Sequence, residues 1–233
     1  MQIEVAINKT AKYAVSESGD SAEVVERPTG GLTALIADGQ GSGRSAKIIS
    51  NLVISKAAGL VADGTRDGAV ARAAHDFLFA LRDGKVSATL TMLSVDLLSR
   101  TVVISRNSHC PVLIRLRGQV QMLADSVNPI GYHHHMKPVI HEIPLEEDLL
   151  LVTFTDGILY AGRYFGQQLE LADFREAMLQ ATASEPQLLA DKLFTHALAL
   201  DKARPADDMT LLVLGINGTE GDPVGRLRVT YPL

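Results

Sequence analysis

Apolar residues recur along most of the chain with the periods of strands and helices. Within residues 1–7 every second residue is apolar, which predicts a strand with one buried face. Residues 32–37 and 209–216 are nearly continuous apolar runs, which favour fully buried strands. Apolar residues recur at helical spacing within 44–60 and 67–82, so both segments are predicted to be helices.

The other predicted elements follow the same two periods. The middle of the chain is rich in short alternating segments, and we interpret the four strands between residues 88 and 123 as a meander. A short stretch at 227–231 has the pattern of an edge strand. The remaining predictions are strands at 12–15, 22–26, 88–97, 101–105, 112–116, 119–123, 138–143 and 149–154, and helices at 169–180 and 185–200.

The order of these elements favours an α+β class with sandwich-type layering. Two helix pairs stand between blocks of hairpin-linked strands, whereas a doubly wound sheet would alternate strand and helix throughout. There is no linker rich in Pro, Gly or Ser and no internal repeat. We therefore expect residues 1–233 to form a single domain.

Composition and charge exclude several classes of function. Hydrophobic residues make up 46% and charged residues 21% of the 233 residues, as in an ordinary globular protein. The net charge of −5 and the 5% of aromatic residues argue against a nucleic-acid partner. No apolar run approaches the length of about 20 residues that a membrane span needs. The single cysteine, Cys110, and the lack of an apolar leader are consistent with a cytoplasmic location.

Aspartates stand at the ends of several predicted strands. Asp38 and Asp156 follow apolar runs, Asp207 and Asp208 precede one, and Asp20 precedes the strand at 22–26. Carboxylates beside buried strands are costly unless they are paired or bound to a cation. Hard divalent cations such as Mg²⁺ and Mn²⁺ prefer oxygen ligands of this kind. The strand ends therefore predict a metal site.

The Asp-Gly pairs at 38–39 and 156–157 could also be ordinary turns. Asp-Gly is common in turns, and the chain holds further copies at 63–64, 67–68 and 83–84. Asp38 and Asp156 differ from these because both follow apolar strands. A glycine after each lets the backbone turn sharply, so that carbonyl oxygens can approach a metal.

Three other motifs do not meet the spacing that their chemistry requires. The glycine-rich loop 39–43 lacks the Gly-Lys-Ser/Thr of a phosphate-binding loop and the third glycine of a dinucleotide fingerprint. Four residues separate Cys110 from Arg115, one fewer than the cysteine-phosphatase motif requires, so we reject Cys110 as a nucleophile. The run at 133–135 is interpreted as an exposed loop, and His75 and His196 as packing or surface residues.

A set of ordered motifs resembles the metal-dependent PPM/PP2C-type serine/threonine phosphatases. The branch it is most similar to contains bacterial sporulation and stress-response (stressosome) serine phosphatases. The likeness extends over a core of about residues 10–216 and leaves a tail at 217–233. The motifs are SGDS (18–21), ADGQGSG (37–43), ATLTML (88–93), RNSHCP (106–111), NPIG (128–131), TFTDGI (153–158) and DDMTLLVL (207–214).

The resemblance implies a fold and a metal site. The fold would be a four-layer αββα sandwich of two antiparallel sheets flanked by helix pairs. Two Mn²⁺ or Mg²⁺ ions would be bridged by Asp38, with the Gly39 carbonyl on one ion and Asp156 and Asp207 on the other. Asp20 and Asp208 match further acidic positions near the metals. The catalytic residues would be Asp38, Asp156 and Asp207, acting through a metal-activated water.

The implied activity is hydrolysis of phosphoserine or phosphothreonine on a regulatory protein. By resemblance, that protein would be a STAS-type anti-anti-sigma factor or a stressosome scaffold. Gln40 replaces the histidine that eukaryotic members carry after Asp-Gly, and no early phosphate-gripping arginine is evident. We therefore expect weak action on small phosphate esters and efficiency from docking of a protein substrate. The segment 163–180 is expected to border the site.

Two alternatives stay open at this stage. A catalytically inactive PPM-fold binding module would keep the fold without the chemistry, although such proteins lose the metal aspartates that this chain retains. A nucleotide-binding or kinase-like protein would use the glycine-rich loop, but the failed spacing disfavours it.

Overall fold

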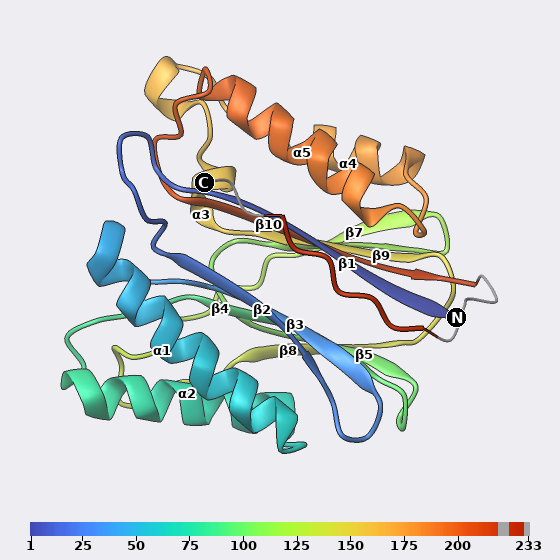
Figure 1. Ribbon diagram of the computed structural model, residues 1–233, viewed down its shortest axis with the longest axis horizontal. Helices are drawn as coiled ribbons and strands as arrows, with labels where there is room; N and C mark the ends of the chain where they lie inside the picture. Colours follow the sequence, from blue (N-terminus) through green and yellow to red (C-terminus); the bar gives the residue numbers. More distant parts are fainter. Residues whose placement is uncertain (219–223, 231–233) are drawn as a thin grey trace.

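The computed structural model describes residues 1–218 and 224–230, and in these its strands form two antiparallel sheets of five (Figure 1). In the first sheet, strands from both ends of the chain lie side by side. Its order is β1 (Gln2–Thr10), β10 (Met209–Asn217), β9 (Leu149–Phe154), β6 (Val112–Leu116) and β7 (Gln119–Leu123). The second is β2 (Asp20–Glu26), β3 (Gly31–Asp38), β4 (Leu90–Asp96), β5 (Thr101–Asn107) and β8 (Val139–Pro144).

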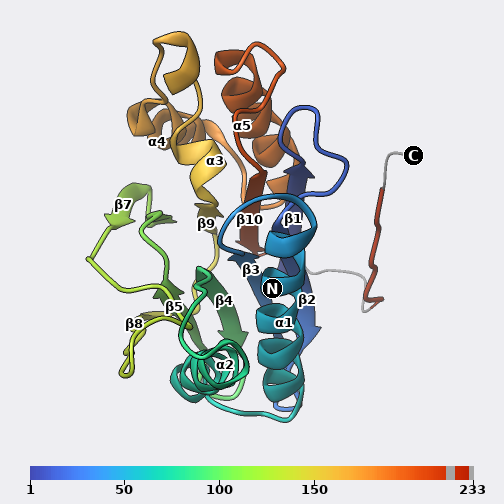
Figure 2. The ribbon, with the colours of Figure 1, turned by 90° about the vertical axis from the view of Figure 1, so that its left-hand side faces the viewer.

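Helices cover the outer faces of both sheets. The pair α1 (Gly43–Ala62) and α2 (Asp67–Arg82) packs on the β2–β8 sheet, and α4 (Leu171–Gln180) and α5 (Pro186–Leu200) pack on the β1–β7 sheet (Figure 2). A short α3 (Asp156–Leu159) and a 3₁₀ turn η1 (Arg163–Phe165) follow β9. The predicted four-layer αββα sandwich is confirmed.

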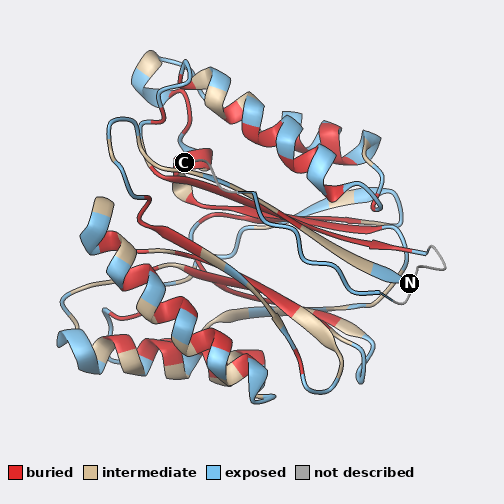
Figure 3. Ribbon diagram, viewed as in Figure 1, coloured by how far each residue is buried: buried red, intermediate tan, exposed pale blue. Residues whose placement is uncertain are grey.

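Three apolar layers hold the sandwich together (Figure 3). The middle layer lies between the sheets and includes Ile36, Leu93, Ile104, Leu151 and Leu214. The two outer layers lie between each sheet and its helices. Strands β9 and β10 are buried along their whole length because both faces are covered, which accounts for their continuous apolar sequences.

Helix α1 is long and apolar enough to cross a membrane by length and composition alone. The sequence predicts a helix here, but its apolar runs are too short to predict a membrane span. In the structure, residues including Ala46, Ile49, Val53 and Ala57 are buried in the layer between α1, α2 and the sheet. Its buried face thus packs between the sheet and α2.

Three predicted elements are wrong. Residues 12–15 form a turn instead of a strand, because Ala14 has a left-handed φ of 63° and the Val15 amide bonds to the Lys12 carbonyl. The middle strands are no meander, since the β4–β5 hairpin and the β6–β7 hairpin belong to different sheets. Residues 227–230 form no strand, and Tyr231 lies outside the described residues.

Four connections meet at one end of the sandwich, on the left in Figure 1. They are the β1–β2 loop, the β3–α1 loop, the β9–α3 junction and the α5–β10 loop. Hydrogen bonds between them hold the ends of both sheets together, such as those from Thr155 and Thr210 to Asp20. This end carries every acidic residue that the sequence singled out.

Candidate active site

Asp20 and Asp38 stand opposite each other at the end of the β2–β8 sheet. Asp20 begins β2 and Asp38 ends β3, and the antiparallel register makes them direct partners. Like charges at directly opposed positions destabilise a strand pair. The two carboxylates therefore need either a proton or a cation between them.

Asp20 is fully buried, and only one of its two carboxylate oxygens accepts hydrogen bonds from the described part of the chain. Its Oδ2 accepts hydrogen bonds from Thr155 Oγ1 at 2.8 Å and Thr210 Oγ1 at 2.6 Å. Its Oδ1 has no hydrogen-bond partner among the described residues. Burial, opposed by the two threonine hydroxyls, raises the pKa of Asp20 to about 7. One buried carboxylate oxygen is therefore available to a cation.

Asp38 lies at the centre of the negative charge. Burial raises the pKa of its carboxyl to about 9, and the nearby carboxylates of Asp20, Asp156 and Asp207 add to that rise. Asp156 begins α3, and burial together with Asp207 raises its pKa as well. Four carboxylates from four connections thus repel one another around Asp38. A bound divalent cation would remove this repulsion.

Asp207 and Asp208 are adjacent but differ in their surroundings. Asp208 is buried, and its Oδ1 and Oδ2 accept the backbone N–H groups of Lys12 and Gly19, both at 2.8 Å. Asp207 is partly exposed, and one of its oxygens accepts the Asp208 N–H at 2.9 Å. Asp208 therefore ties the β1–β2 loop to the start of β10, while the second oxygen of Asp207 accepts no hydrogen bond from the part of the chain that the structure describes.

Gly39 is required where the backbone turns from β3 towards α1. A Cβ at this position would lie 2.1 Å from the Ala46 carbonyl oxygen, far inside contact distance. A bridge to Ala88 holds the same residue from the other side. Next to it, Gln40 Oε1 accepts the Ser87 N–H at 2.9 Å, so Gln40 anchors the loop and supplies no acidic proton.

Two lysines lie behind the carboxylates. Lys9 Nζ and Lys47 Nζ donate to the backbone carbonyl of Asp20 at 2.7 and 2.6 Å, and Lys47 Nζ also donates to Ser21 Oγ. Burial and the neighbouring Lys47 lower the pKa of Lys9 to about 8. These cations lower the negative potential of the site without binding the carboxylate oxygens.

His109 is a site residue that the sequence analysis missed. Its Nε2 lies 3.9 Å from Asp156 Oδ2, and its ring stacks on that of Tyr160 with the centroids 5.9 Å apart. His109 was passed over because it stood beside the rejected Cys110. Its position after β5, at the end where β3 also ends, is the signal that could have identified it.

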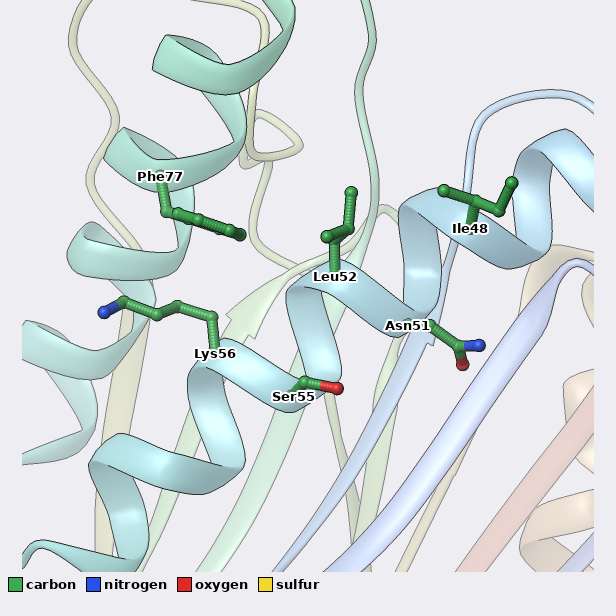
Figure 4. A pocket seen from close by; sticks show the side chains of 6 residues that line it. All are labelled: Ile48, Asn51, Leu52, Ser55, Lys56 and Phe77. Carbon is green, nitrogen blue, oxygen red and sulfur yellow. The ribbon is translucent and has the colours of Figure 1, made fainter.

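The carboxylates surround the site without forming a closed cluster. Among residues 1–218 and 224–230, no three acidic, histidine or cysteine side chains stand close enough to form a ready-made ion cage. Two hollows in the surface lie elsewhere, one of about 440 Å³ on α1 and α2 (Figure 4) and one of about 460 Å³ on α4 and α5. The first is lined by Leu52 and Phe77 and contains no carboxylate.

The remaining predicted residues fall where the sequence put them. Cys110 is buried, and burial raises the pKa of its thiol, so it is a poor nucleophile. The loop at 133–135 is exposed. His75 is buried and accepts the Gly131 N–H at 3.0 Å, and His196 forms a surface pair with Asp173. Cys110 lies near the acidic end, since the charges of Asp156, Asp38 and Asp20 add to the rise that burial causes in the pKa of its thiol.

Comparisons with known proteins identify the family of the chain and its fold. The family model for Stage II sporulation protein E (SpoIIE) matches residues 28–217. The PP2C phosphatase domain of SpoIIE from Bacillus subtilis, solved with a fragment of its regulatory domain, superposes with a TM-score of 0.79 at 23% identity. That alignment covers 93% of this chain and 64% of the other, so this chain spans less than two thirds of that protein.

Two metal-bound structures have the same fold. The catalytic domain of the serine/threonine phosphatase PstP with two manganese ions gives a TM-score of 0.72 at 16% identity, over 92% of this chain and 98% of that one. RsbX with magnesium gives 0.71 at 17% identity, over 92% and 96%. No curated protein matches the sequence. The likeness to these structures is one of fold.

Proposed function

Since this chain belongs to the Stage II sporulation protein E (SpoIIE) family and has the PP2C phosphatase fold, we propose that it is a metal-dependent protein phosphatase. Its substrate would be phosphoserine or phosphothreonine on a regulatory protein, of the STAS or stressosome-scaffold type, in the cytoplasm. One observation carries the proposal. Four carboxylates, those of Asp20, Asp38, Asp156 and Asp207, converge from four connections, and the charges of the other three add to the rise that burial causes in the pKa of Asp38.

The donor set fits two Mn²⁺ or Mg²⁺ ions. Every candidate ligand is an oxygen, as these hard cations prefer. Asp38 would bridge the ions, the Gly39 carbonyl would bind one, and Asp156 and Asp207 would bind the other. The buried Oδ1 of Asp20, which has no hydrogen-bond partner among the described residues, supports a cation in this position. When bound, the metals supply an activated water and neutralise phosphoryl charge.

The residues around this set keep it in place. Thr155 and Thr210 hold Asp20 by one oxygen, so the other would be left for a cation. Asp208 would contribute by fixing the β1–β2 loop, because both of its oxygens already accept loop N–H groups. Lys9 and Lys47 favour the ionised carboxylates that metal binding requires. Gln40 is committed to Ser87, so we assign it no proton transfer.

Hydrolysis of p-nitrophenyl phosphate tests the proposal. The protein is assayed with EDTA, Mg²⁺ or Mn²⁺, together with the variants Asp38→Ala and Cys110→Ser. We expect activity with Mn²⁺, a loss of at least about a hundredfold in Asp38→Ala, and retention in Cys110→Ser. Activity that survives EDTA would contradict the two-metal chemistry. No activity with any metal would favour the inactive binding module.

A further inference from the structure

Three rings beside the acidic end are each covered by a cation. Arg163 lies 3.9 Å above the ring of Tyr160, Lys202 lies 4.7 Å above Phe165, and Arg204 lies 5.4 Å from the centre of Tyr13. We call these six residues the cation–ring band. All three cations are exposed, as are Tyr160 and Tyr13.

The band is continuous although its residues come from three segments of the chain. The Tyr13 N–H donates to the Pro205 carbonyl at 2.9 Å, which joins the β1–β2 loop to the loop after α5. The β1–β2 loop and the loop after α5 lie side by side in both Figures 1 and 2.

A buried carboxylate fixes the band to the metal-site loop. Asp201 is 1% exposed, and its two oxygens accept the Gly162 N–H at 2.7 Å and the Ala206 N–H at 2.8 Å. Gly162 directly precedes Arg163, and Ala206 directly precedes Asp207. The cations are thus held at a fixed position relative to a proposed metal ligand.

The band reaches the site through His109. The His109 ring stacks on the ring of Tyr160, and Arg163 also lies over the Tyr160 ring. His109 Nε2 lies 3.9 Å from Asp156 Oδ2. Exposed cations at the edge of the site attract an acidic partner on approach, and exposed tyrosines and arginines are typical of protein interfaces.

We propose that the cation–ring band docks an acidic segment of the phosphoprotein, next to the phosphoserine in its sequence. The inference rests on the proposed function and adds to it the class of sequence that the site selects. The sequence predicts that the segment 163–180 borders the site, and only its first residues do so. Residues 160–165 lie beside it, whereas α4 packs on the outer face of the β1–β7 sheet.

The test compares two synthetic phosphoseryl peptides, one flanked by Glu residues and one by Lys residues, with p-nitrophenyl phosphate as a reference. We expect the wild type to favour the acidic peptide in kcat/KM by about tenfold at low salt. Lys202→Glu/Arg204→Glu should abolish this preference, and Lys202→Gln/Arg204→Gln should reduce it about threefold. The matched control Arg175→Glu/Lys192→Glu changes exposed residues of α4 and α5 and should leave it unchanged.

Equal use of the two peptides by the wild type would overturn the inference, as would an equal effect of the control. A change of oligomeric state without a change in peptide preference would assign the band to self-association and also overturn it. Fluorescence anisotropy of the labelled acidic peptide, with Mn²⁺ present, separates the two proposals. If no phosphate ester is hydrolysed, selective binding that Lys202→Glu/Arg204→Glu abolishes still supports the band.

Discussion

Asp20 and Asp38 are direct cross-strand partners at the ends of β2 and β3. Two carboxylates in this relation destabilise the strand pair when both are ionised, and burial of Asp20 increases the effect. The repulsion between these carboxylates therefore destabilises the metal-free fold at the end where the family motifs meet. A divalent cation bound there would remove the repulsion, and this would favour its binding.

Removing the central charge is predicted to stabilise the metal-free protein. The pKa of Asp38 is about 9 in the fold and 3.8 as its ordinary value, so the folded state binds more protons between these two pH values. Stability then falls as pH rises through this window. Asp38→Asn should raise the free energy of unfolding at pH 8 by about 1–3 kcal/mol, or about 2–10 °C in Tm.

Thermal unfolding in EDTA measures this effect, and the gain should shrink as the pH approaches 4. The control is Asp63→Asn, which changes another Asp-Gly dipeptide. Asp63 follows the last residue of the 20-residue α1, about 30 Å along the helix from its start near Asp38. A Tm at pH 8 no higher than that of the wild type would contradict the account.

The threonine bonds to Asp20 give a second prediction. Thr210→Val removes the 2.6 Å bond to a buried carboxylate and should lower the free energy of unfolding by about 1.5–3 kcal/mol at neutral pH. Thr153 provides a matched control on the neighbouring β9, because its buried hydroxyl has no partner among the described residues. Thr153→Val should be neutral or stabilising. Equal losses in the two variants, measured by denaturant unfolding, would rule out the role given to Thr210.

The close approach at Gly39 gives a third prediction. Gly39→Ala would bring a Cβ to 2.1 Å from the Ala46 carbonyl, so the β3–α1 loop must shift. We expect a loss of about 1–3 kcal/mol in stability, together with loss of Mn²⁺-dependent activity. Gly59→Ala in α1 has open space at its Cβ and should stabilise by about 1 kcal/mol. An active Gly39→Ala protein of normal stability would refute the requirement for glycine.

The order of the predicted elements was sufficient to predict an α+β sandwich, and the strand ends predicted the acidic end. Asp38 and Asp156 follow apolar runs, and such runs end where strands leave the core. The helices follow from their periodicity, but their place on the outer faces of the two sheets was implied only by the resemblance to the PPM/PP2C phosphatases. The sheet to which each strand belongs could not be predicted in the same way. The β5–β6 connection crosses from one sheet to the other, but its residues look like any turn between neighbouring strands.

The contacts around the site depend on tertiary structure. Thr155 and Thr210 are ordinary strand residues in the sequence, and only the register of β9 and β10 brings both to Asp20. Asp207 and Asp208 look equivalent in the sequence, yet backbone amides of the β1–β2 loop donate to both carboxylate oxygens of Asp208. Arg163 and Lys202 are far apart in the chain, so no local pattern indicates their common surface.

Isothermal titration calorimetry of Mn²⁺ into the metal-free protein measures directly whether the acidic end binds metal. We expect saturable binding of about two ions per chain. Binding should weaken as the pH is lowered from 8 towards 6, because the carboxylates take up protons. Asp38→Asn should abolish binding, and Asp63→Asn should leave it unchanged. No binding by the wild type, or the same binding by both variants, would contradict the assignment of these carboxylates as a metal site.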